Sequence, residues 1–217
     1  MIYIHHHLGL GDHIICNGLV RELVKNDSSC LYAKHTNANT VRLMYRDLLN
    51  LSIIGVNNDE EITNPMALRI GFDYILKARE KNLTWDQAFY HQCGIDFNKR
   101  WDSFFIKRDY EREQDLYKKL NPLDLPFSLV HSKGSDGIER VKEEYVSKKI
   151  LKIKIEKDIT NNMLDYIGLI NKAEEIHCID SSIKHLCDSF NLKAKLFYHN
   201  VPARGFPHKE KNDWRIV

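Results

Sequence analysis

The 217-residue sequence predicts an α/β protein with two halves, each a parallel sheet covered by helices. Short apolar stretches of strand length alternate with segments in which apolar residues recur at helical spacing. This order begins near residue 2 and begins again near residue 127, after the Asn121-Pro122 break. At about 150 residues per domain, the length fits one large domain or two small ones. We therefore expect an N-terminal lobe over residues 1–120 and a C-terminal lobe over residues 121–217.

The first half is expected to open with a strand over residues 2–6 and a glycine turn over residues 8–12. A helix follows, because apolar residues in 14–24 recur at helical spacing. Together these elements form the start of a βαβ unit. Thr84 is the expected N-cap of a later helix, and Gly94 its terminating glycine. The other expected strands are 29–33, 51–56 and 72–76, and the helices are 39–49, 84–93 and 110–120.

The second half is expected to repeat this order. Its strands are 127–131, 150–155, 176–179 and 194–198, and its helices are a segment ending near Tyr145, then 158–172 and 181–188. Strands that alternate with helices favour parallel sheets that are covered on both faces.

Composition excludes several classes of protein. The formal net charge is only +2, whereas a dedicated nucleic-acid-binding domain usually has a pI above about 9. The longest apolar run falls short of the ~18 residues of a membrane span, and the start lacks the pattern of a secretory signal. The five cysteines are widely spaced without a C-x-x-C motif, which suits reduced thiols better than disulfides or zinc. We therefore expect a cytoplasmic protein that binds no nucleic acid.

The first candidate loop is Gly9-Leu10-Gly11-Asp12-His13, between the first strand and the first helix. Such a turn lets the backbone approach a ligand, and the helix amides behind it favour an anion. It is not the dinucleotide pattern G-x-G-x-x-G, because Ile14 follows where a glycine is needed. Asp12 has two readings, an N-cap of the helix or a general base at the carboxyl edge of a parallel sheet.

The second candidate loop, Asp180-Ser181-Ser182-Ile183-Lys184-His185, also follows an apolar strand and opens a helix. Ser181 and Ser182 have small side chains at a helix start, which suits phosphate. His185 lies one turn on, on the same helix face. The alternative is that Asp180 or Ser181 only caps the helix and His185 only packs.

Two further groups are weaker candidates. Lys133 follows the strand at 127–131 and could meet a phosphate, although a lone loop lysine is usually solvated. His5, His6 and His7 could hold a metal, but they alternate across a strand without an adjacent acidic or cysteine ligand, so we expect no metal site. Motifs of metal-dependent sugar transfer (D-x-D), of P-loop ATPases and of α/β-hydrolases are absent from the sequence.

At the two loops the sequence resembles a known family. Residues 6–15, HHLGLGDHII, resemble the first-strand glycine loop of GT-B glycosyltransferases of the heptosyltransferase type, glycosyltransferase family 9. Residues 173–186, AEEIHCIDSSIKHL, resemble the donor-site segment of that family, where a short strand precedes D-[ST]-G-x-x-H-[LF]. The chain departs from this pattern at Ser182, which replaces the glycine, and it is much shorter than a usual GT-B enzyme.

The resemblance implies two Rossmann-like lobes that face a cleft, with the acceptor on the N-terminal lobe and a nucleotide-sugar on the C-terminal lobe. It implies inverting transfer without metal or cofactor. Asp12 matches the base, Gly9 and Gly11 give close backbone approach, and Ser181, Ser182 and His185 match the contacts to the donor phosphates. To these donor contacts we add Asp180, which opens the second candidate loop, and Lys133, in the loop after the strand at 127–131.

The expected function is metal-independent transfer from a nucleotide-diphosphate sugar to a glycan or lipid-linked acceptor, in glycan or polysaccharide synthesis. Contact with a membrane surface stays open. The first alternative is a non-catalytic nucleotide- or sugar-binding protein that keeps the GT-B-like fold. The second is another α/β enzyme of this shape, such as a nucleotide-sugar epimerase.

Overall fold

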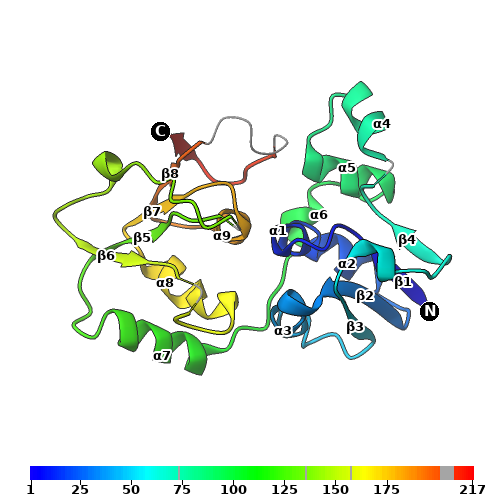
Figure 1. Cartoon of the computed structure of the whole chain (residues 1–217), viewed down its shortest axis with the longest axis horizontal. Coiled ribbons are helices and arrows are strands. Elements are labelled where there is room, and N and C mark those ends of the chain that lie inside the picture. The colour runs from blue at the N-terminus through cyan, green and yellow to red at the C-terminus, as the bar shows by residue number, and fades with distance from the viewer. Residues whose placement is uncertain (73, 135, 157, 201–207) are drawn as a thin grey trace. The chain divides into compact units, whose positions relative to one another are not determined.

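The structure is a computed structural model that describes all residues from 1 to 217 except 73, 135, 157 and 201–207 (Figure 1). The chain divides into two compact units. Unit 1 comprises Met1–Lys107 and Phe206–Lys209, and unit 2 comprises Arg108–Gly205 and Glu210–Val217. In the described part of the chain, unit 1 contains a sheet of four strands and unit 2 a sheet of five, and the strand pairings in both sheets are parallel. The predicted α/β class with two parallel sheets is confirmed.

The sheet of unit 1 has the order β3-β2-β1-β4, so the first strand of the chain lies inside it. Its strands are β1 (Ile2–His5), β2 (Ser29–Lys34), β3 (Leu51–Val56) and β4 (Ala67–Arg69). Ile4 of β1 pairs with Leu31 on one side and Leu68 on the other, and it is completely buried. Because β1 pairs in parallel with both neighbours, the loop after it lies at the carboxyl edge of the sheet, where α/β folds bind ligands.

The helices of unit 1 bury apolar stripes. They are α1 (Leu10–Ile15), α2 (Asn17–Leu23), α3 (His35–Met44), α4 (Tyr74–Glu80), α5 (Trp85–Gln92) and α6 (Lys99–Asp102), with a 3₁₀ turn η1 (Asp59–Glu61). Ile14, Ile15 and Leu19 are at most 2% exposed and belong to the core. A Cβ on Gly18 would overlap the carbonyl oxygen of Lys99, so glycine lets α6 approach α2.

The sheet of unit 2 has the order β6-β5-β7-β8-β9. Its strands are β5 (Phe127–His131), β6 (Leu151–Lys154), β7 (Glu175–Cys178), β8 (Lys195–Tyr198) and β9 (Trp214–Ile216). Its helices are α7 (Tyr110–Leu120), α8 (Ile167–Lys172) and α9 (Ser182–Cys187), with 3₁₀ turns η2 (Glu143–Tyr145) and η3 (Met163–Tyr166). Leu129, Val130 and Ile176 of the central strands are fully buried. Helix α7, expected in the N-terminal lobe of residues 1–120, lies in unit 2.

Several expected elements are confirmed. The strands at 29–33, 51–56, 127–131, 150–155, 176–179 and 194–198 agree with the structure to within about one residue at each end. Helix α5 begins directly after Thr84, which forms a capping box with Gln87, and Gly94 has a positive φ of 65°.

Other expectations are wrong. The strand expected at 72–76 is replaced by β4 at Ala67–Arg69, followed by Gly71 with a φ of 93° and helix α4 from Tyr74; residue 73 lies outside the described residues. A short apolar run does not distinguish a strand from a helix, which explains this error.

In unit 2, no helix forms between residue 137 and Tyr145 apart from the turn η2, and the chain there contains an antiparallel bridge between Lys133 and Glu139. The helix expected from residue 158 begins only at η3, because Asn162 accepts a hydrogen bond from Leu164 N (2.9 Å) and acts as its N-cap. Strand β9 was not expected, because its three residues are too few to show alternation.

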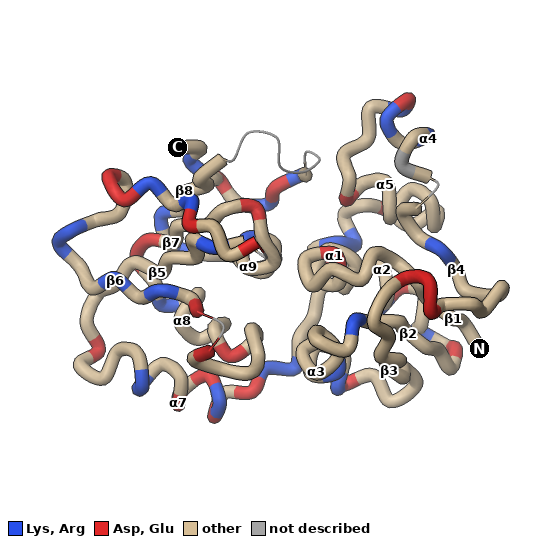
Figure 2. Tube along the Cα trace, viewed as in Figure 1, with Lys and Arg blue, Asp and Glu red and all other residues tan. Residues whose placement is uncertain are grey.

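Charges of both signs are interspersed along the trace of each unit (Figure 2). None of the helices in the described part of the chain is long and apolar enough to cross a membrane.

Candidate functional site

The carboxyl edge of the sheet in unit 1 carries Asp12. The chain leaves β1 at His5 and enters α1 at Leu10, with Gly9 as an extended N-cap (φ −66°, ψ 142°). Asp12 is therefore the third residue of α1, and the reading of Asp12 as the N-cap is wrong. A Cβ on Gly9 would lie 2.6 Å from Oδ2 of Asp12, so the absence of a side chain leaves the space that the carboxylate occupies. Gly11 lies inside the helix rather than in the turn.

The Asp12 carboxylate accepts a hydrogen bond from an indole. Nε1 of Trp85, the first residue of α5, donates to Oδ1 of Asp12 at 3.1 Å. The Trp85 ring lies 4.8 Å from the His7 ring and 5.2 Å from the Phe89 ring, between ring centroids. Sequence reasoning missed Trp85. The Thr84 cap located the start of α5, but no local signal connects residue 85 with residue 12.

The three consecutive histidines have separate partners. His5 Nε2 lies 2.7 Å from Oδ1 of Asp59, His6 faces the ring of His13 at 4.4 Å, and the ring of His7 stacks on Phe72 at 4.5 Å. Burial lowers the pKa of His6 to about 4 and lowers the pKa of His13 well below its ordinary value. Both rings are therefore neutral at pH 7, and His13 belongs to α1, the helix that carries Asp12.

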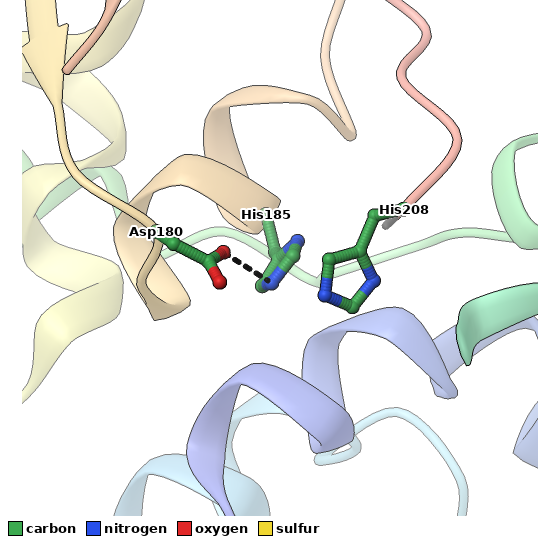
Figure 3. A group of neighbouring side chains, drawn as sticks. All are labelled: Asp180, His185 and His208. Atoms are coloured by element: carbon green, nitrogen blue, oxygen red, sulfur yellow. Dashed lines mark ion pairs between the residues drawn. The ribbon is translucent and has the colours of Figure 1, made fainter. Parts of the chain in front are cut away.

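In unit 2 the predicted donor residues open helix α9. Ser181 is the extended N-cap, and its hydroxyl accepts a hydrogen bond from Lys184 N at 3.4 Å. Ser182 is the first helical residue. The carboxylate of Asp180 lies 3.7 Å from Nε2 of His185, and Figure 3 shows the two side chains facing each other. His208, also drawn there, belongs to unit 1, where it lies 4.0 Å from Asp86.

The far end of α9 is held by the chain that follows residue 209. The Asp188 carboxylate, only 1% exposed, accepts hydrogen bonds from Lys211 N, Asn212 N and Nε1 of Trp214. On the preceding turn, the buried Lys184 ammonium lies 2.5 Å from Glu210. These contacts fix the axis of α9 and therefore the direction in which its first amides point.

Lys133 lies in the loop that follows β5. Strand register pairs His131 at the end of β5 with Cys178 at the end of β7. Lys133 and Asp180 each come two residues after this pair, so both belong to loops at the same carboxyl edge. The structure thus brings Asp180, Ser181, Ser182 and His185 together, with exposed Lys133 in the neighbouring loop. Gly9, Gly11 and Asp12 lie in unit 1.

A buried histidine pair also lies in the sheet of unit 2. Nδ1 of His177 and Nε2 of His199 are 3.0 Å apart, and Nδ1 of His199 accepts a hydrogen bond from Lys142 N at 3.2 Å. A neutral His199 therefore carries its proton on Nε2 and donates it to His177. Burial, followed by the neighbouring charges of His177 and Lys142, lowers the pKa of His199 to about 4.

No protein-family model matches the sequence, and no curated protein matches it. The structure is similar to the crystal structure of the glycosyl transferase family 9 protein from Veillonella parvula DSM 2008, with a TM-score of 0.59 and 11% sequence identity. The similarity covers 100% of this chain and 86% of that chain. The chain therefore has the two-sheet α/β fold of a GT-B glycosyltransferase of family 9.

Proposed function

We propose that the protein is a glycosyltransferase that transfers a sugar from a nucleotide-diphosphate donor to a glycan or lipid-linked acceptor. The observation that carries this proposal is the position of Asp12 on this fold. A carboxylate lies at the carboxyl edge of the first sheet, over a glycine that leaves room for it. The similarity in fold to a glycosyl transferase supports the same reaction class, although fold alone does not determine function.

In the proposed reaction, Asp12 is the general base of the acceptor lobe. It takes the proton of the acceptor hydroxyl while the hydroxyl oxygen attacks the anomeric carbon of the donor sugar. The bond between that carbon and the diphosphate oxygen breaks, and the nucleoside diphosphate leaves with the electron pair. Attack from the face opposite to the leaving group inverts the anomeric carbon. The proposal includes no metal and no cofactor.

Unit 2 is the proposed donor lobe. The first amides of α9 and the Ser182 hydroxyl are donors at the positive end of a helix, where a diphosphate is favoured. His185 can donate a ring N–H to the same group, and Lys133 in the neighbouring loop supplies positive charge. These groups would stabilise the charge that develops on the departing diphosphate. Asp180, beside His185, would orient the imidazole.

Donor binding is tested by a thermal-shift screen with nucleoside diphosphates and their sugars. A ligand at 100 times its Kd stabilises the native state by about 2.7 kcal/mol, so binding raises the melting temperature. His185→Gln should reduce the shift, whereas the exposed His35→Gln should keep it. If no nucleotide stabilises the protein at millimolar concentration, the donor proposal fails.

Catalysis is tested with Asp12→Asn and Asp12→Ala, using the exposed Asp27→Asn as the control. We expect the Asp12 variants to bind the donor normally and to lose sugar transfer, while the control keeps both. Unchanged transfer rates would remove Asp12 as the base.

The alternative of a non-catalytic nucleotide- or sugar-binding protein is favoured by Ser182. Its side chain takes the place of the glycine in the family pattern and narrows the space for a phosphate. Nucleotide binding without turnover against a panel of acceptors would support this alternative. Turnover of a donor without an acceptor would support an epimerase instead.

A further inference from the structure

Trp85, which donates a hydrogen bond to the Asp12 carboxylate, is part of a packed support. The Trp85 indole is fixed by rings on two sides, His7 and Phe89, in addition to its hydrogen bond to Oδ1 of Asp12. One oxygen of the Asp12 carboxylate is thus bound to an indole N–H, and the other lies over Gly9, in the space that a Cβ would fill. This arrangement crosses 73 positions of sequence, so it is a product of the tertiary fold.

The start of α5, which carries Trp85, is held from its other side. Next to Trp85, Asp86 is fully buried and forms an ion pair with Arg100, which is 2% exposed. Oδ2 of Asp86 accepts a hydrogen bond from the backbone N–H of Lys209 (3.0 Å), and Nη1 of Arg100 donates to the carbonyl oxygen of Lys209 (2.7 Å). The buried pair therefore binds both the backbone N–H and the backbone carbonyl of Lys209. All three residues belong to unit 1.

We infer that Trp85 is a positioning residue for Asp12, and that the buried Asp86–Arg100 pair holds Trp85 in place by fixing the first turn of α5. This inference deepens the proposed function and rests on it, since it assigns Trp85 a part in the reaction of Asp12. The indole N–H stabilises the carboxylate over the carboxylic acid and fixes the direction of its lone pairs toward an acceptor hydroxyl. It takes no part in proton transfer itself.

The test compares Trp85→Phe with Trp101→Phe. Trp101, on α6 of the same unit, has a buried indole nitrogen for which the described residues show no hydrogen-bond partner. Both substitutions remove an indole, but only the first removes a donor to a carboxylate. Replacing Trp85 by benzothienylalanine, in which sulfur replaces the N–H in a ring of nearly the same shape, keeps the test open if the Phe variant does not fold.

Two readouts follow. The titration of the Asp12 carboxyl carbon, observed by NMR in protein with labelled aspartate and assigned with Asp12→Asn, should move to higher pH by about one pH unit in the Trp85 variants. Sugar transfer should fall about tenfold, and the acidic limb of its pH profile should move in the same direction. The Trp101 variant should leave both readouts unchanged.

The two proposals fail separately. If the Asp12 titration moves but the wild-type protein transfers no sugar, the proposed function is wrong and Trp85 still orients the carboxylate. If Asp12→Asn abolishes transfer while neither Trp85 variant changes the titration or the pH profile, the positioning role is refuted. A loss of activity in Trp85→Phe with an unchanged titration would also refute it, because a merely structural role predicts that result.

Discussion

Replacing Arg100 by Met tests how strongly the buried ion pair stabilises unit 1. Arg100 and Asp86 have side chains 3% and 0% exposed, so the substitution leaves a carboxylate buried without its counter-ion. Breaking a buried pair from one side typically costs about 3–5 kcal/mol. Asp86 keeps hydrogen bonds from the Thr84 hydroxyl (2.6 Å) and from Lys209 N, which offset part of that cost. We therefore expect the free energy of unfolding of unit 1 to fall by about 3 kcal/mol, near the lower end of that range.

The assay is urea denaturation followed by a probe in each unit, because a chain of two units need not unfold in one step. The matched control is the exposed pair between Lys152 and Glu143, 2.8 Å apart, where Lys152→Met should cost less than about 1 kcal/mol. The double variant Asp86→Leu with Arg100→Met should be less destabilised than the sum of the single changes, because it leaves no buried charge. A loss in Arg100→Met as small as in the control would refute the reasoning.

Two further predictions concern pH and the glycine loop. The pKa of His199 is lowered to about 4 by burial, against about 6.5 in the unfolded chain, so the unfolded state binds the proton more readily. Stability should therefore be constant above about pH 6.5 and fall as the pH drops toward 4, by up to ~1.4 kcal/mol per pH unit from this residue. Urea midpoints measured across that range should show a smaller dependence in His199→Gln, and an equal dependence would contradict the assignment. Gly9→Ala should fold normally, since the φ of −66° and ψ of 142° at this position suit alanine. The added Cβ would displace the Asp12 carboxylate, so sugar transfer should fall at least tenfold. Wild-type turnover in this variant would show that the space over Gly9 is not used.

The order of strands and helices could be predicted wherever a segment carried its own periodic signal. The central strands β1, β5 and β7 are apolar runs bounded by turn residues, and the start of α5 was located from Thr84. The same reasoning failed where neighbours decide the structure. Residues 74–76 lie in helix α4, and the position beside β1 is occupied by β4, whose residue Arg69 pairs with His5.

The candidate site could be predicted only in part, for the same physical reason. Asp12 and the segment from Asp180 to His185 were found because each lies in a short motif between a strand and a helix. Trp85 was missed because its hydrogen bond to Asp12 joins segments that no local pattern connects. His199 was missed in the same way, since its partner His177 lies on the neighbouring strand.

The two motif helices also show why the residues after 207 matter for the site. Helices α1 and α9 have six residues each, well below the ~12–15 residues that an isolated helix needs in water. Contacts elsewhere must therefore hold these helices in place. For α9, Asp188 receives three donors from residues 211–214, and for the support of Asp12, the buried pair on α5 binds the backbone of Lys209. One short C-terminal stretch thus stabilises the surroundings of both motifs, through the backbone of residues 209, 211 and 212 and through the side chains of Glu210 and Trp214.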